Sequence, residues 1–192
     1  VGEVTDYAVI ENVFDNAEIG CISVDGSVET LYDYSSVKCV CDNGNIFSVE
    51  GNAVVMEVKD IALINNVNKN GTIQKVTGFG IVENVYDNAI IEEVSDDGVI
   101  ENVYGNSVVK YVCGNGSINN LFGSAVVECV TDNGTVEKVK GNGIVKVVRD
   151  KGKVKLISEN GIVESTRIDG EIWKGSNRIP TSVDILNRKG KQ

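Results

Sequence analysis

Histidine and cysteine, two of the side chains that most often carry catalysis, are scarce in this sequence. Its 192 residues include five cysteines and no histidine. A cysteine or serine nucleophile normally depends on a neighbouring base, and histidine is the side chain that most often supplies it. Mechanisms that need an imidazole are therefore excluded, and we expect no nucleophilic cysteine chemistry.

Carboxylates are the second candidate for chemistry, because some of them are adjacent in the sequence. Glu92-Glu93 and Asp96-Asp97 could in principle supply the acid and the base for glycoside cleavage. Nothing in the neighbouring sequence would raise the pKa of one member of either pair above that of the other. Solvated acidic surface is a far commoner role for such residues. The sequence also lacks a phosphate-binding loop, a Cys-x-x-Cys pair and a Ser-His-Asp set. We therefore predict a protein that is not an enzyme, with no catalytic residues, no cofactor and no metal site.

An internal repeat determines the elements that would position any site. Tyr86, Tyr104 and Phe122 are spaced 18 residues apart within similar segments. Two columns of nine aliphatic residues follow the same step, nine residues out of phase with each other: Val13, Leu31, Val49, Val67, Val85, Val103, Leu121, Val139 and Ile157, and Val4, Ile22, Val40, Val58, Val76, Val94, Val112, Val130 and Val148. The 18-residue unit is therefore two copies of a nonapeptide.

Each nonapeptide has two aliphatic residues three positions apart, followed by Asp or Gly and often Asn, as in residues 125–133 and 134–142. This spacing would also suit a helix, but Val dominates, and Gly and Asn-Gly turn signals recur every nine residues. Short strands joined by tight turns fit the pattern better. We predict an all-β fold, a two-sided parallel β-solenoid with about ten 18-residue coils (two nonapeptides each).

The pattern resembles the nonapeptide-repeat β-rolls and other short-coil β-solenoids over about nine-tenths of the chain. The resemblance implies an architecture and no activity. Calcium-binding β-rolls repeat Gly-Gly-x-Gly-x-Asp-x-aliphatic-x, whereas stretches such as 132–134 lack the paired glycines. We expect Asp and Asn to serve tight turns instead, because both tolerate positive φ. Left-handed hexapeptide helices need an aliphatic residue every six positions, which this sequence does not have.

The extent of the repeat also predicts the domain boundaries. We expect a solenoid domain over residues 1–178 with a degenerate last coil, a C-terminal cap over 173–186 and a basic tail over 187–192. The pattern breaks after Ile172, and the only proline, Pro180, follows. A solenoid needs a cover over its last open edge, which is the role that we assign to the cap.

The cysteines fall into two columns of the repeat. Cys21, Cys39 and Cys129 share one position, and Cys41 and Cys113 share another position two residues later. Stacking would bring Cys21 close enough to Cys39 for a disulfide in an oxidising compartment. An odd number of cysteines, in columns that also hold Ser, Thr, Glu and Lys, favours reduced thiols. We therefore expect a cytoplasmic protein, with a phage particle or a cell surface as the alternative location.

One side of the predicted rod combines carboxylates with aromatic rings. The hypothetical partner-binding residues, which flank one aliphatic column at multiples of 18, are Glu11, Phe14, Glu29, Tyr32, Glu83, Tyr86, Glu101, Tyr104 and Phe122. Exposed aromatic residues with polar rims are typical of protein interfaces. The alternative is that the rings stack between coils and stabilise the sheet without any partner.

Charge is divided along the chain. Residues 1–137 hold 5 Lys and Arg against 22 Asp and Glu, a formal charge of −17, whereas residues 138–192 carry +7, and the whole chain carries −10. An acidic rod is a poor ligand for duplex DNA or an anionic membrane, and no apolar run reaches the 18 residues of a membrane span.

These features predict a non-enzymatic, protein-binding solenoid. We expect its acidic and aromatic shaft to dock on a basic partner surface, as an inhibitor or nucleic-acid mimic directed at a nucleic-acid-binding protein. The alternative is a structural element, such as a segment of a phage or cell-surface fibre or appendage, that self-assembles as a homo-oligomer through the ends of the solenoid.

Overall fold

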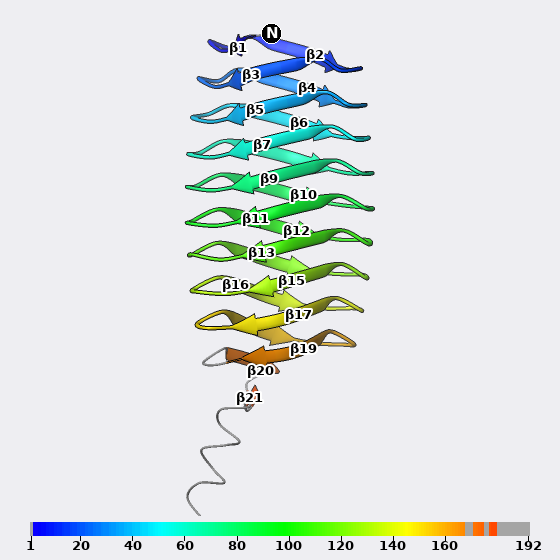
Figure 1. Ribbon diagram of the computed structural model, residues 1–192, viewed down its shortest axis with the longest axis vertical. Coiled ribbons are helices and arrows are strands. Elements are labelled where there is room, and N and C mark those ends of the chain that lie inside the picture. The colour runs from blue at the N-terminus through cyan, green and yellow to red at the C-terminus, as the bar shows by residue number, and fades with distance from the viewer. Residues whose placement is uncertain (1, 168–170, 175–176, 180–192) are drawn as a thin grey trace, which may run out of the picture.

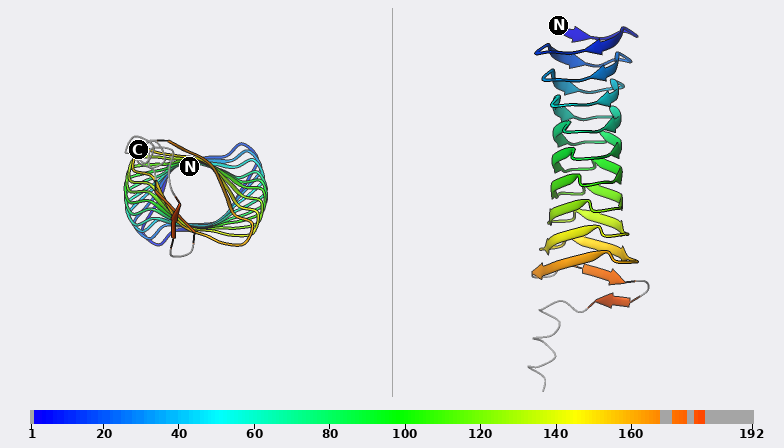
Figure 2. Two further views of the ribbon diagram at one scale, coloured as in Figure 1. Left: turned by 90° about the horizontal axis from the view of Figure 1, so that it is seen from below. Right: turned by 90° about the vertical axis from the view of Figure 1, so that its right-hand side faces the viewer.

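The computed structural model describes residues 2–167, 171–174 and 177–179, which form a rod of stacked coils (Figure 1). Each coil of about 18 residues contributes one strand to each of two parallel sheets, and about nine coils stack with no helix among the described residues. Seen along the rod, the sheets face each other and the turns form two edges (Figure 2). The predicted all-β, two-sided solenoid is therefore confirmed.

Successive strands alternate between the two sheets. The odd-strand sheet contains β1 (Glu3–Val4), β3 (Glu18–Ile22), β5 (Ser36–Val40), β7 (Val54–Val58), β9 (Thr72–Val76), β11 (Ile90–Val94), β13 (Val108–Val112), β15 (Val126–Val130), β17 (Ile144–Arg149) and β19 (Ile162–Arg167). The even-strand sheet contains β2 (Val9–Val13), β4 (Ser27–Leu31), β6 (Asn45–Val49), β8 (Leu63–Val67), β10 (Ile81–Val85), β12 (Val99–Val103), β14 (Ser117–Leu121), β16 (Thr135–Val139), β18 (Lys153–Ile157), β20 (Glu171–Lys174) and β21 (Asn177–Ile179).

The core lies between the sheets and is built mainly from two inward residues of each full strand, with Ala53, Ala62, Ala89 and Ala125 added from between the strands. In β12, Ile100 and Val103 are fully buried, whereas Val99, Glu101 and Asn102 are partly exposed. Neighbouring strands pair so that each residue meets its equivalent 18 positions later in the sequence. Both predicted aliphatic columns are buried along their whole length. The helix-like spacing of three therefore arises from strands that turn their second and fifth residues inward.

The turns explain the recurring Asp or Gly. Backbone φ is positive at every ninth residue from position 6 to position 159, and the residue there is Asp or Gly at all but three positions. Residues other than Gly, Asn and Asp rarely adopt this left-handed conformation, because Cβ crowds the backbone. The expectation that Asp serves tight turns with positive φ is confirmed, whereas Asn lies in the turns without positive φ at any described position.

Val24 is the least suitable of the three exceptions, because it is β-branched and has a φ of 47°. We expect Val24→Asn to stabilise the protein by about 1 kcal/mol and to raise Tm by roughly 2–4 °C. The converse change Asp42→Val, at the equivalent position of the next coil, should lower Tm by a similar amount. Thermal unfolding followed by circular dichroism checks both variants, and a lower Tm for Val24→Asn would contradict this account of the turns.

Pairing between coils ends where the sequence pattern breaks. β20 continues the parallel sheet alongside β18 as far as Ile172, and β21 then pairs with β20 in the antiparallel sense. β21 lies within the segment predicted as the cap. Residues 175–176 and 180–186 of that predicted cap, and the predicted tail, residues 187–192, lie outside the described residues.

Candidate functional site

The candidate site is the outer surface of the even-strand sheet from β2 to β14, together with the aromatic residues that follow its strands. We call this surface the even-strand face. In β12, Glu101 and Asn102 point outward at the third and fourth positions, and Tyr104 begins the next turn. All the predicted partner-binding residues lie on this side, at β2 (Glu11, Phe14), β4 (Glu29, Tyr32), β10 (Glu83, Tyr86), β12 (Glu101, Tyr104) and β14 (Phe122).

Aromatic rings form two stacks along the border of the even-strand face. The centroids of Phe14 and Tyr32 are 5.7 Å apart. Tyr104 lies between Tyr86 and Phe122, with centroid separations of 5.1 and 5.2 Å and interplanar angles of 9°. Stacking between coils, which the sequence allowed as an alternative role for these rings, is therefore present. It holds the rings in place while leaving all five partly exposed.

Two lysines near the aromatic stacks, Lys69 and Lys140, already have partners. Between the two stacks, Lys69 Nζ donates to Glu50 Oε2 at 2.7 Å, and this hydrogen bond lowers the pKa of the Glu50 carboxyl below its usual range. At the far end, Lys140 Nζ lies 5.6 Å from the centroid of the Phe122 ring, within the range of a cation–π contact. Neither lysine neutralises a predicted binding carboxylate through the contacts that it makes here.

An asparagine ladder runs along the even-strand face from β8 to β14. Asn84, Asn102 and Asn120 each donate from Nδ2 to the Oδ1 of the asparagine one coil earlier, at 3.1–3.4 Å. The same amide nitrogens also reach backbone carbonyls of the preceding coil at 3.3–3.5 Å. Repeated amide contacts of this kind add to the hydrogen bonding of stacked parallel strands. The ladder makes this part of the face a regular surface.

Two predicted binding carboxylates lie beside the ladder and accept hydrogen bonds from amides. Asn65 donates to Glu83 at 3.0 Å, and Asn119 donates to Glu101 at 2.7 Å. An amide orients a carboxylate without removing its negative charge, because the amide itself is neutral. These two glutamates are therefore held in position and remain available to a cationic partner.

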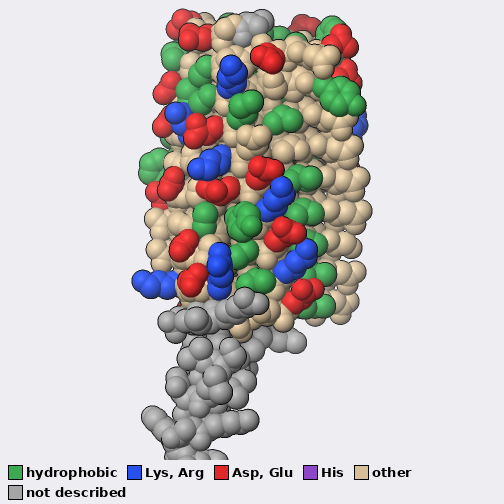
Figure 3. Space-filling view, in the orientation of Figure 1, with side chains coloured by type: hydrophobic (Ala, Val, Ile, Leu, Met, Phe, Trp, Pro, Cys, Tyr) green, Lys and Arg blue, Asp and Glu red, His purple; other side chains and the backbone are tan. Residues whose placement is uncertain are grey.

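The two outer faces of the rod differ in charge. The even strands from β2 to β14 contain four glutamates and no lysine or arginine. The outer face of the odd-strand sheet, which we call the odd-strand face, shows acidic and basic side chains interspersed (Figure 3). Three ion pairs there join neighbouring coils, Lys75–Glu93 at 3.4 Å, Lys110–Glu92 at 2.9 Å and Lys146–Glu128 at 3.0 Å. Negative charge is therefore balanced by nearby lysines on the odd-strand face and is not balanced on the even strands from β2 to β14.

A hollow of about 440 Å³ lies at the N-terminal end of the even-strand face, with Val9, Glu29 and Phe47 among its lining residues. Val9 and Phe47 are 61% and 58% exposed. Neither residue is among the predicted partner-binding residues. The available signal was that Phe47 takes the outward position that Glu11 and Glu29 hold in the two preceding coils.

The adjacent carboxylates that were considered for catalysis have contacts within the stack. Glu92 and Glu93 belong to the ion pairs of the odd-strand face. Asp96 is a left-handed turn residue, and Asp97 accepts a hydrogen bond from Asn115 of the next coil at 3.3 Å. Each of the four acidic residues therefore has a structural role in the solenoid.

The cysteines are all free thiols, and three of them lie together. Cys21 and Cys39 are neighbours in adjacent strands, as predicted. The sulfur of Cys21, however, contacts Cys41 Sγ at 3.4 Å, a contact that sequence analysis did not predict. Burial raises the pKa of the Cys39 and Cys41 thiols. These two thiols are therefore protonated near neutral pH, which makes them poor nucleophiles.

None of the protein-family models, curated proteins or solved structures compared with this chain matches it. The residues that the structure describes include no helix long and apolar enough to cross a bilayer. A functional assignment must therefore come from the geometry and charge of the exposed side chains.

Proposed function

We propose that this chain is a non-enzymatic binding module whose even-strand face docks onto a basic surface of a partner protein. The observation that carries the proposal is the charge contrast between the two faces. From β2 to β14 the even strands have four glutamates and no basic residue, whereas lysines pair with glutamates across the odd-strand face. Complementary charge of this kind steers association and discriminates between partners.

The aromatic stacks supply the contact area that charge alone does not provide. Large rings contribute strongly to binding when they are held in place before association, because little side-chain freedom is then lost. Tyr86, Tyr104 and Phe122 are fixed by stacking and are still partly exposed. The hollow beside Phe47 offers a second apolar contact on the same face. Charge and apolar area therefore occur together on one rigid surface.

The partner class that fits this surface is a protein that binds nucleic acid. Such proteins present rows of lysine and arginine to a phosphate backbone. Carboxylates on this rod recur at multiples of the strand spacing, about 4.8 Å, on a stiff support. Occupying the basic groove in place of nucleic acid would make the chain an inhibitor of its partner.

Charge reversal on each face tests the proposal. Glu83→Lys/Glu101→Lys alters the even-strand face, and Glu92→Lys/Glu128→Lys makes the same change in net charge on the odd-strand face. We expect the first variant to lose capture of a basic protein from a lysate of the source cells at low salt, and the second to retain it. The measurement is quantitative capture by the three proteins, with Tm recorded to show that each variant is folded.

Two results would contradict the proposal. Equal loss of capture by both variants would mean that only the overall charge matters, and capture that persists at high salt in the first variant would place the interface elsewhere. Light scattering at several concentrations serves as the companion measurement. Growth of long assemblies without a partner, in the parent and in both variants, would favour the structural, self-assembling role.

A further inference from the structure

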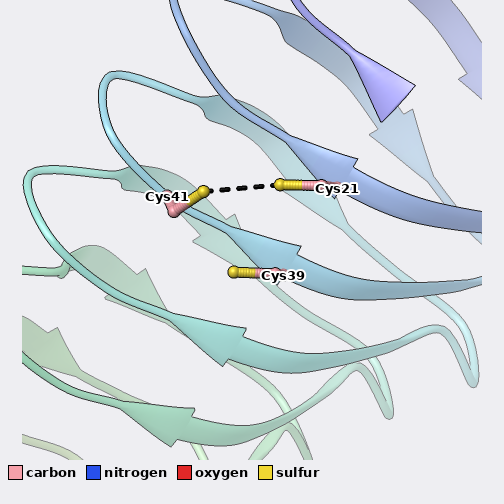
Figure 4. A group of neighbouring side chains, drawn as sticks. All are labelled: Cys21, Cys39 and Cys41. Carbon is pink, nitrogen blue, oxygen red and sulfur yellow. Dashed lines mark hydrogen bonds between the residues drawn. The ribbon is translucent and has the colours of Figure 1, made fainter. Parts of the chain in front are cut away.

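Three cysteine sulfurs converge on the outer side of the odd-strand sheet near its N-terminal end (Figure 4). Cys21 lies in β3, Cys39 lies in β5, and Cys41 begins the turn that follows β5. Their Sγ atoms all lie within 4.8 Å of one another, and those of Cys21 and Cys41 are 3.4 Å apart. In Figure 4, Cys21 and Cys39 extend in the same direction, and the Cys41 side chain points back toward Cys21.

These separations are close to the spacing of sulfur ligands around one metal ion. Thiolates about 2.3 Å from a zinc ion in trigonal or tetrahedral geometry lie roughly 3.7–4.0 Å from one another. The observed Cys21–Cys41 sulfur separation of 3.4 Å is somewhat shorter than this range, and no pair of the three sulfurs is more than 4.8 Å apart. All three cysteines are partly exposed, which leaves room for a water molecule in a fourth position.

The surroundings also suit a cation held by thiolates. Glu57 pairs in register with Cys39 on the next coil, and the Asp42 carboxylate lies 4.0 Å from Cys41 Sγ. Lys59, whose Nζ lies 3.9 Å from Glu57 Oε2, supplies one positive charge beside the cluster. The soft sulfur ligands select zinc-like ions over magnesium or calcium.

The fold itself does not require three thiols at this place. The same columns hold Ser23 and Ser95 at the position of Cys41, and Ser165 at the position of Cys21. Cys113 and Cys129 occupy these columns in later coils, and neither belongs to a comparable group of metal-ligating side chains within the described residues. The cluster is therefore a local feature superimposed on the repeat.

We propose that Cys21, Cys39 and Cys41 form a binding site for a single thiophilic divalent metal ion of the zinc class. Binding replaces three S–H bonds by three metal–sulfur bonds, and the three protons pass to the solvent without any change of oxidation state. The site is on the odd-strand face and is independent of the proposed docking surface. It would join two successive coils near the N-terminal end of the rod.

Cadmium serves as the spectroscopic probe, because thiolate coordination produces a charge-transfer absorption in the ultraviolet. The full chain, kept reduced with a phosphine, is titrated with Cd²⁺ and then with Zn²⁺. We expect the absorption to saturate at one Cd²⁺ per chain and Zn²⁺ to displace it. Cys21→Ser, Cys39→Ser and Cys41→Ser should each weaken binding by more than about tenfold.

The double variant Cys113→Ser/Cys129→Ser is the matched control, because it removes two thiols from the same columns and should leave the titration unchanged. Circular dichroism confirms that each variant is folded. Absence of the absorption in the reduced parent would overturn the proposal. So would an unchanged titration in Cys41→Ser, or a loss in the double variant equal to that in Cys41→Ser. Formation of a disulfide between two of the clustered cysteines, with no Cd²⁺ bound after its reduction, would assign the cluster to redox chemistry instead.

Discussion

Replacement of Val103 or Val112 by aspartate is expected to abolish folding. Both side chains are fully buried, one from each sheet, in the middle of the two aliphatic columns. A carboxylate there would be enclosed by Val, Ile and Leu side chains of its own and adjacent coils, without a cationic partner among them. The cost of an unpaired buried charge is several kcal/mol, a large part of the stability of a typical domain. Far-UV circular dichroism and thermal unfolding measure the effect.

Matched controls lie in the same strands. Val99→Asp in β12 and Val108→Asp in β13 introduce the same side chain at outward, partly exposed positions. We expect these two variants to fold and to lose about 1 kcal/mol, because Asp is a poor strand residue but remains solvated. If Val103→Asp melted within a few degrees of the parent, the assignment of inward and outward positions would be wrong.

The second large effect concerns the longer aromatic stack. We expect the triple variant Tyr86→Ala/Tyr104→Ala/Phe122→Ala to bind the captured partner at least roughly thirtyfold more weakly, because truncating one central interface ring commonly costs about 2 kcal/mol or more. Two stacked contacts are also lost, at about 0.5–1.5 kcal/mol each, so Tm should fall by several degrees. Affinity is therefore measured at a temperature where both proteins remain folded.

The control removes exposed rings that lie elsewhere on the rod. Phe79 is 63% exposed in a turn that follows an odd strand, and Tyr111 is 48% exposed on the odd-strand face. Phe79→Ala/Tyr111→Ala should retain partner affinity. If the triple variant lost stability but bound the folded partner as tightly as the parent, the stacked rings would be purely structural.

The sequence predicted the contacts that run along the rod, because each residue meets the residue 18 positions later. Val85 and Val103, or Tyr86 and Tyr104, can be paired by counting. The left-handed turn position could likewise be recognised from the recurring Asp and Gly. Equivalent residues of successive coils have the same backbone conformation, and their side chains therefore have similar surroundings.

Contacts between different columns of the repeat could not be predicted from the 18-residue spacing. The approach of Cys21 to Cys41 joins two columns on neighbouring coils and depends on how the chain enters the turn. The hydrogen bonds from Asn65 to Glu83 and from Asn119 to Glu101 depend on side-chain rotamers. Spacing alone places such residues near each other without determining which atoms meet.

The association rate with the captured partner, measured at low and at high salt, tests the docking claim most directly. We expect Glu83→Lys/Glu101→Lys to slow association by about tenfold or more at low salt and Glu92→Lys/Glu128→Lys to stay within about twofold of the parent. The difference should disappear at high salt. Equal rates for the two charge-reversal variants at low salt would contradict the claim that the even-strand face is the docking surface.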